Sequence, residues 1–213
     1  MTDPRLDPQA VLWSAEPAAD RPLLVLLHGY GADEKDLFGL AGFLPDDFVL
    51  AAPRAPLSPP WPAPGFSWYP LDGADSRDAA PVTAAAAALH AWLDEHAPAA
   101  SVGLLGFSQG AAVALQALRL EPERFSFVVN LSGYATPGDL PRDAELADLR
   151  PPVFWGRGTR DDVIPAPLVE HTTLWLPEHS TLSGRVYEGL THSVSEQELA
   201  DVSTFLDKQL AQG

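Results

Sequence analysis

The chain has 213 residues, of which 46% are hydrophobic and 20% charged, and this length and composition predict one α/β domain over residues 1–213. Its formal net charge of −16 disfavours binding to nucleic acid and to anionic lipid headgroups. The absence of cysteine excludes disulfides, thiolate metal sites and a cysteine nucleophile. Without a signal peptide or an apolar run of about 20 residues, the sequence predicts a cytoplasmic protein with no stable membrane insertion.

Strands and helices are expected to alternate in the first half of the chain. The clearest helix covers residues 81–97, where apolar residues recur at helical spacing after Pro81. Residues 53–78 are rich in proline and aromatic side chains, and a loop of this length in a compact domain is usually functional. The other elements expected here are strands at residues 11–13, 23–27 and 48–52 and a helix at 34–44.

The second half continues the alternation. Ser195 and Glu198 form the pattern of a capping box, which predicts where the last helix begins. Residues 136–152 combine proline with charges of both signs and are expected to form a surface connection. Strands alternating with helices predict an α/β fold, in which a mostly parallel sheet carries helices on both faces. The other elements expected are strands at residues 102–105, 127–131, 153–155 and 185–188 and helices at 111–118 and 166–176.

Residues 106–110 read Gly-Phe-Ser-Gln-Gly and join an expected strand to an expected helix. A Gly-x-Ser-x-Gly at such a turn is typical of a nucleophile elbow. The sharp turn strains the serine and leaves no room for a Cβ on either side, so glycine is needed there. Ser108 would then project above the sheet edge, with the backbone NH of Gln109 directed to the same space. A bare pentapeptide also fits a glycine-rich strand end with an N-cap serine, so the context decides.

A serine nucleophile needs a base and a third group that orients the base. In chains of this architecture the partners follow in the order serine, acid, histidine. The loops after the expected strands offer Asp161 or Asp162 and then His192. Adjacent side chains of an extended loop point apart, so only one of the two aspartates can orient the histidine. Taken alone, Asp161 also fits a turn former and His192 a surface histidine beside a helix cap.

Five segments carry motifs in a fixed order along nearly the whole chain. They are the elbow at 106–110, His28-Gly29-Tyr30-Gly31, Trp68-Tyr69, Asp161-Asp162-Val163-Ile164-Pro165 and Thr191-His192-Ser193-Val194-Ser195. Together they resemble the phospholipase/carboxylesterase family, which includes the acyl-protein thioesterases. The resemblance implies an α/β-hydrolase fold without a separate cap domain.

The resemblance also implies a role for each matched residue. It identifies Ser108 as the nucleophile, His192 as the general base and Asp161 as the acid, because the family's acid stands at that spacing before the proline. Asp162 also satisfies the order serine, acid, histidine, but it does not stand at the family's spacing before the proline. The same resemblance places His28 in the motif, where we expect it to brace its loop and not to act as a base.

The remaining matched residues are implied to contact the substrate. The backbone NH groups of Tyr30 and Gln109 are the implied oxyanion donors. Many family members have leucine at the first of these positions, and the tyrosine ring is expected to narrow the pocket while the main-chain donor is kept. Trp68 and Tyr69 match the family's aromatic pair beside the acyl site, although the same two side chains would also fit a role in covering the core.

The resemblance implies a serine hydrolase that cleaves carboxylic esters through an acyl-enzyme, and we expect a short- to medium-chain carboxylesterase. The alternatives are a lysophospholipase or an acyl-protein thioesterase, and a non-catalytic binding protein on the same fold. The expected partner is a small-molecule ester or thioester, and the resemblance leaves a homodimer open. Residues 156–158 begin like a dinucleotide fingerprint, but Asp161 stands at the third glycine position. We therefore expect no organic cofactor. The three aspartates within residues 72–78 fit a solvated acidic loop better than a set of converging ligands, so no metal is expected either.

Overall fold

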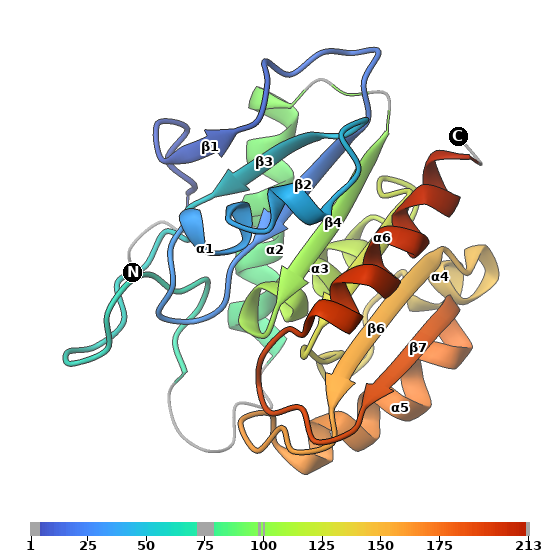
Figure 1. The fold of residues 1–213 in the computed structure, drawn as a ribbon. Helices are drawn as coiled ribbons and strands as arrows, with labels where there is room; N and C mark the ends of the chain where they lie inside the picture. Colours follow the sequence, from blue (N-terminus) through green and yellow to red (C-terminus); the bar gives the residue numbers. More distant parts are fainter. Residues whose placement is uncertain (1–4, 72–78, 98, 100, 212–213) are drawn as a thin grey trace.

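A seven-stranded sheet in the order β1-β3-β2-β4-β5-β6-β7 forms the centre of the protein (Figure 1). The computed structural model describes residues 5–71, 79–97, 99 and 101–211. All neighbouring strands are parallel except β1, which pairs antiparallel with β3 at the edge. The strands are β1 (Val11–Trp13), β2 (Leu23–Leu27), β3 (Val49–Pro53), β4 (Val102–Phe107), β5 (Phe127–Leu131), β6 (Pro152–Gly158) and β7 (Thr181–Tyr187).

Helices cover both faces of this sheet, as expected from the alternating pattern. One apolar cluster joins one face to Leu89, Leu115 and Leu168 of α2, α3 and α5, and a second joins the other face to Leu37 of α1 and Val202 of α6. Figure 1 shows α6 crossing in front of the sheet, with α2, α3 and α5 behind it. The helices are α1 (Lys35–Phe38), α2 (Ala79–His96), α3 (Gln109–Leu120), α4 (Asp143–Leu149), α5 (Ala166–His179) and α6 (Glu196–Leu210).

The helix expected over residues 34–44 is divided in the structure. It consists of α1 and a separate 3₁₀ turn at Ala41–Phe43. Gly39 is the C-cap of α1, and Gly42 lies inside the 3₁₀ turn. Each glycine costs a helix about 1 kcal/mol relative to alanine, so a continuous helix is not favoured here.

The surface connection expected over residues 136–152 is wrong in two respects. It contains α4, whose Leu146 is fully buried in the core, and its first residue, Thr136, is also buried. The strands expected at 153–155 and 185–188 also differ, since β6 runs on to Gly158 and β7 already begins at Thr181. The glycine pair at 156–158 therefore lies in a strand and not in a loop.

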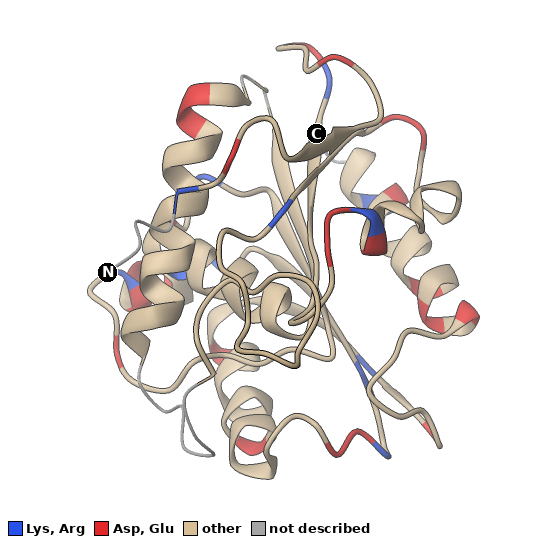
Figure 2. Ribbon diagram, turned by 90° about the vertical axis from the view of Figure 1, so that its left-hand side faces the viewer, with Lys and Arg blue, Asp and Glu red and all other residues tan. Residues whose placement is uncertain are grey.

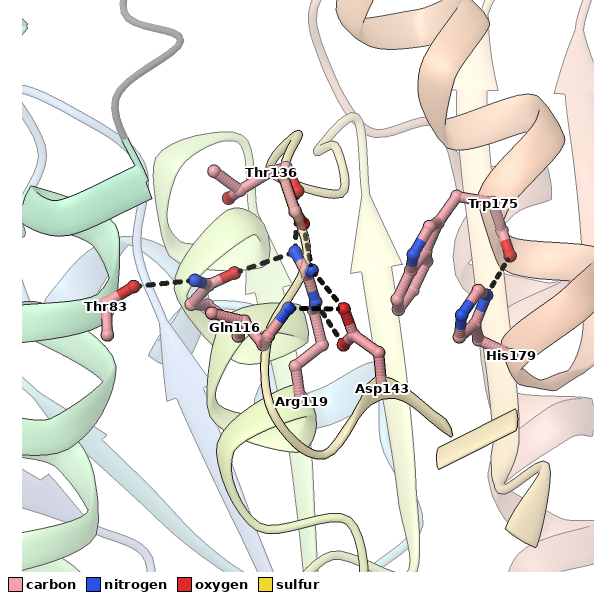
Figure 3. Close-up of polar contacts among 9 residues, drawn as sticks. Thr83, Gln116, Arg119, Thr136, Asp143, Trp175 and His179 are labelled. Atoms are coloured by element: carbon pink, nitrogen blue, oxygen red, sulfur yellow. Dashed lines mark hydrogen bonds and ion pairs between the residues drawn. The ribbon is translucent and has the colours of Figure 1, made fainter. Parts of the chain in front are cut away.

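Arg119 of α3 holds the beginning of this connection in place (Figure 3). Its guanidinium is 1% exposed and donates to the carbonyl oxygens of Thr136 and Gly138, each at 2.6 Å. It also makes two hydrogen bonds to the carboxylate of Asp143, at 2.9 and 2.7 Å, and lies 4.9 Å from the centre of the Trp175 ring. Burial alone would raise the pKa of Asp143, but the hydrogen bonds from Arg119 and the Leu140 NH, together with nearby positive charge, outweigh it and the pKa is lowered.

We expect Arg119→Met to destabilise the fold by about 3–5 kcal/mol, because two carbonyls lose their buried donor and the Asp143 carboxylate keeps, among the described residues, only the Leu140 NH and no cation. In a chain of this size such a loss lowers Tm by about 10 °C or more. Arg124→Met is the matched control, since Arg124 pairs with the exposed Asp94 at the protein surface, where an ion pair contributes little. Equal losses of Tm in the two variants would contradict a structural role for the buried pair.

Candidate active site

Ser108 lies at the sharp turn between β4 and α3, in a strained conformation. Its φ of 54° and ψ of −114° are unfavourable for a residue with a side chain, and its NH donates to the carbonyl of Leu131 at 2.9 Å. A Cβ at Gly106 would lie 2.5 Å from the nitrogen of Ala111, and one at Gly110 would lie 2.0 Å from the carbonyl oxygen of Leu27. Both glycines are therefore required by close backbone contacts.

Two hydrogen bonds connect Ser108, His192 and Asp161. The hydroxyl oxygen of Ser108 is 2.8 Å from Nε2 of His192, and Nδ1 of His192 is 2.8 Å from Oδ2 of Asp161. These residues follow β4, β7 and β6, whose carboxyl ends lie at the same edge of the sheet. The Phe107 ring packs beside the imidazole, with 4.9 Å between the ring centres. Residues 84 positions apart in the sequence are thus brought into contact.

Asp161, and not Asp162, faces His192 in the structure. The Asp161 side chain is 5% exposed, and its Oδ1 accepts hydrogen bonds from the backbone NH groups of Val163 and Ile164 at 3.0 and 3.2 Å. The neighbouring Asp162 is exposed. Asp161 therefore stabilises a turn with one oxygen and contacts the imidazole with the other. It combines the role of turn former with that of the acid partner, the two roles that the sequence allows.

The backbone NH groups of Tyr30 and Gln109 belong to the two loops that follow β2 and β4. Within the described part of the chain, neither NH has a hydrogen-bond partner. Gln109 is also the first residue of the 12-residue helix α3, whose N-terminal end favours negative charge. Unpaired NH groups on two loops that follow neighbouring strands at the edge that carries Ser108 are the kind of donors that stabilise an oxyanion.

His28 braces its loop. Its Nε2 accepts a hydrogen bond from the NH of Ala55 at 3.1 Å, so the proton is on Nδ1, which donates to the carbonyl of Gly29 at 2.8 Å. Burial lowers the pKa of His28, and the contact with Gly29 offsets only part of this effect. A neutral imidazole with both nitrogens occupied agrees with the expected structural role.

Trp68 and Tyr69 are both buried. The indole NH of Trp68 donates to the carbonyl of His28 at 2.8 Å, and the Tyr69 hydroxyl is 2.7 Å from that of Tyr134. The structure thus places both rings beside the loops of the site, with Trp68 also supporting the loop that carries Tyr30. Tyr134 was not singled out from the sequence, although its position shortly after β5 assigns it to the same sheet edge.

The side chain of Gln109 is a second residue that sequence reasoning missed. Its Oε1 accepts from the NH of Trp68 and its Nε2 donates to the carbonyl of Tyr69, both at 2.8 Å. The residue after the nucleophile therefore clamps the loop between β3 and α2.

An ion pair holds the beginning of the same loop. Arg54 makes two 2.6 Å hydrogen bonds to the carboxylate of Glu34, and these hydrogen bonds lower the pKa of Glu34 to about 2.

Residues 55–71 of this loop contain no charged side chain, although the chain as a whole carries a net charge of −16. Figure 2 views the molecule from the side on which the loop projects in Figure 1. An uncharged segment beside Ser108 suits an apolar substrate group better than a charged one. Residues 72–78, the rest of the expected loop, lie outside the described residues.

Among residues 5–71, 79–97, 99 and 101–211, no three histidine, aspartate or glutamate side chains converge as metal ligands would. The expectation that the chemistry needs no cofactor stays a prediction. In the same part of the chain, no helix has both the length and the apolar character to cross a bilayer.

The sequence profile of the phospholipase/carboxylesterase family matches residues 9–210. The chain belongs to this family. Its fold is the α/β-hydrolase fold, as expected from the motifs. Among solved structures, esterase PE8 is 28% identical, with a TM-score of 0.77 and coverage of 97% of this chain and 99% of its own. A carboxylesterase from Mesorhizobium loti, 22% identical, shares the fold with a TM-score of 0.74 over 96% of this chain and 99% of its own.

Sequence relatives include several fungal proteins named acyl-protein thioesterase 1. The one from Debaryomyces hansenii is 35% identical over 122 residues, which are 55% of this chain and 53% of the relative. The one from Eremothecium gossypii is 27% identical over 216 residues, 92% of this chain and 90% of the relative. The matched part of this chain spans about half the length of the first three of these relatives.

Proposed function

We propose that this protein is a serine hydrolase that cleaves carboxylic esters through an acyl-enzyme on Ser108. The observation that carries the proposal is the unbroken pair of 2.8 Å hydrogen bonds joining Ser108 Oγ, His192 and Asp161. A nucleophile in contact with a base, and a base in contact with a buried carboxylate, is the arrangement that acyl transfer requires. Membership of the phospholipase/carboxylesterase family supports the same reaction class.

In this mechanism Ser108 Oγ attacks the carbonyl carbon while Nε2 of His192 takes its proton. Asp161 accepts the hydrogen bond from Nδ1–H and stabilises the imidazolium that forms. The tetrahedral intermediate then collapses, and Nε2 donates the proton to the leaving alkoxide or thiolate. A water molecule, activated by the same imidazole, attacks the acyl-enzyme and releases the carboxylic acid and Ser108.

The oxyanion of each tetrahedral intermediate would be held by the backbone NH groups of Tyr30 and Gln109. Each such donor contributes roughly 3 kcal/mol to lowering the barrier. Both donors are main-chain groups. A tyrosine at position 30 therefore supplies the same NH as a leucine would, even if its ring narrows the pocket.

The substrate we favour is a short- to medium-chain carboxylic ester with an uncharged acyl group. The loop at residues 55–71 has no charged side chain and includes the buried aromatic pair Trp68 and Tyr69. A charged acyl group would find no ion-pair partner on this loop, so an uncharged one is favoured. An acyl-protein thioesterase is the second candidate, since several relatives have this name. A lysophospholipase, a cytoplasmic location and a homodimer remain predictions.

The test is a series of p-nitrophenyl esters from acetate to laurate, with a long-chain acyl thioester alongside. We expect kcat/KM to be highest for the short and medium chains and a fluorophosphonate probe to label Ser108. A maximum at laurate would favour a long-chain enzyme, a lysophospholipase or a thioesterase, over a short- to medium-chain carboxylesterase. Faster cleavage of the thioester than of the ester of equal length would favour a thioesterase. A folded protein that neither hydrolyses esters nor takes the probe would instead be a non-catalytic binding protein.

A further inference from the structure

Two glycines near the end of β6 lie against the segment that carries His192. A Cβ at Gly158 would be 1.9 Å from the carbonyl oxygen of Leu190, and one at Gly156 would be 2.1 Å from Oε1 of Glu198. Neither position has room for a side chain. The glycine pair that begins like a dinucleotide fingerprint therefore serves the close approach of two parts of the protein.

These contacts lie on both sides of His192 in the sequence. Leu190 precedes the histidine by two residues, and Glu198 follows it by six. The end of β6 continues to Asp161, and on the way the NH of Arg160 donates to the carbonyl of Leu190 at 2.9 Å. The 190–198 segment, which carries His192, therefore packs against the end of the strand that leads to Asp161.

Glu198 is the unusual member of this contact. Its side chain is fully buried in the first turn of α6, and neither carboxyl oxygen has a hydrogen-bond partner within the described residues. The backbone NH of Glu198 donates to the Ser195 hydroxyl at 3.1 Å, which is one half of the expected capping box. In the other half, the backbone NH of Ser195 is close enough to the Glu198 carboxyl to favour its ionised form, but no hydrogen bond of normal geometry joins them. A fully buried carboxyl held only by this weak contact lowers stability, so its place against Gly156 calls for a further reason.

We infer that Glu198 is a positioning residue: its carboxyl, packed against Gly156, sets the distance between β6 and the turn that carries His192. It acts through the Asp161–His192 hydrogen bond and has no contact with substrate in this role. The inference rests on the proposed function of His192 and Asp161.

The charge state of Glu198 decides how well it can fill this position. Burial raises the pKa of Glu198 to about 7; the Ser195 backbone opposes the rise and the charge of Asp201 adds to it. Below that pH the carboxyl is neutral and packs against Gly156, whereas above it the carboxylate loses its hydration in the buried site and is driven toward water. The ionisable groups that act on Glu198 are Asp201 on α6 and Tyr187 on β7. Asp201 in turn contacts the Tyr187 hydroxyl at 2.9 Å and Arg185 of β7 at 3.9 Å.

Glu198→Gln tests this inference, because the amide keeps the shape of the neutral carboxyl and cannot ionise. We expect the ratio of its kcat/KM to that of the wild type to rise several-fold between pH 6 and pH 9, with the change centred near pH 7. Glu196→Gln is the matched control: it removes the same charge from an exposed position of the same helical turn, and its ratio should not depend on pH. A pH-independent ratio for Glu198→Gln, or the same profile in both variants, would overturn the inference.

A second pair of variants tests the contact itself. Gly156→Ala forces the Glu198 carboxyl aside and should lower kcat with little effect on KM, whereas in a Glu198→Ala background the same change should have no further effect. Additive losses would mean that the two residues do not act together.

A spectroscopic measurement separates this inference from the proposed function. The downfield proton resonance of the His192 Nδ1–H group, donated to Asp161, should broaden above pH about 7 in the wild type and stay sharp in Glu198→Gln. If no ester is hydrolysed, the proposed function fails, and this resonance still decides the role of Glu198: the same broadening in both proteins would refute it.

Discussion

Replacing Ser108 by alanine is expected to lower kcat for ester hydrolysis by roughly 10⁵- to 10⁶-fold. The Ser108 hydroxyl is the group in contact with Nε2 of His192, so the variant loses the atom that forms the acyl-enzyme. Oxyanion donors and bound water would leave only a small residual rate. The measurement is kcat with p-nitrophenyl butyrate for the wild type and the variant. The variant is prepared free of wild-type enzyme, because a trace of wild type would exceed the residual rate.

The same substitution is expected to leave Tm unchanged or to raise it. Alanine keeps the strained φ of 54° at position 108 and removes a hydroxyl from a site that is 9% exposed, and catalytic groups often reduce stability. Ser126→Ala is the matched control, because its hydroxyl pairs with that of Ser101 at an exposed position. A Ser108→Ala protein with full activity would remove the central proposal, and a loss shared with Ser126→Ala would point to a folding defect.

The nucleophile elbow could be predicted from the sequence because its requirements are local. Gly106, Ser108 and Gly110 lie within five residues. The contact that excludes a Cβ at Gly106 lies within the turn, whereas the one at Gly110 is with Leu27 at the end of β2, where the motif marks the need for glycine without showing its partner. The strands around it are short apolar runs whose buried character is also readable in sequence. The rule that parallel strands place their carboxyl ends at one edge then assembles the remaining candidates in the right region.

Other features depend on contacts between distant segments and gave no sequence signal. The clamp made by Gln109 joins residues 40 and 41 positions apart, and no local pattern distinguishes this glutamine from an exposed one. Helix α4 has only seven residues, too few for stability from helix propensity alone, and it depends on the burial of Leu146 and on the ion pair between Asp143 and Arg119.

The choice between Asp161 and Asp162 shows the same limit at the site itself. Two adjacent aspartates are equivalent in composition, and the residues alone leave both open. The structure separates them by the turn in which Oδ1 of Asp161 accepts two backbone hydrogen bonds. This turn directs Oδ2 of the same residue to His192, while Asp162 is left exposed. The orientation thus depends on backbone conformation, which the sequence pattern does not specify.

Asp161→Asn is therefore expected to lower kcat by about 10⁴-fold, and Asp162→Asn to leave it unchanged within the scatter of the assay. The asparagine is nearly isosteric, and its side-chain oxygen will stay with the NH groups of Val163 and Ile164, which need an acceptor. Its NH₂ group then faces Nδ1 of His192. That nitrogen is forced to accept, so the imidazole proton moves to Nε2, where it can no longer take the proton of Ser108.

This pair of variants isolates the orienting role of the carboxylate, because each removes one negative charge at neighbouring positions. The turn should persist in Asp161→Asn, so Tm is expected to change little while kcat falls, and KM should stay close to that of the wild type since the change affects the proton transfer and not substrate binding. If Asp162→Asn were instead the inactive variant, the acid would be the exposed aspartate, and the loop would have to rearrange before His192 could act as the base.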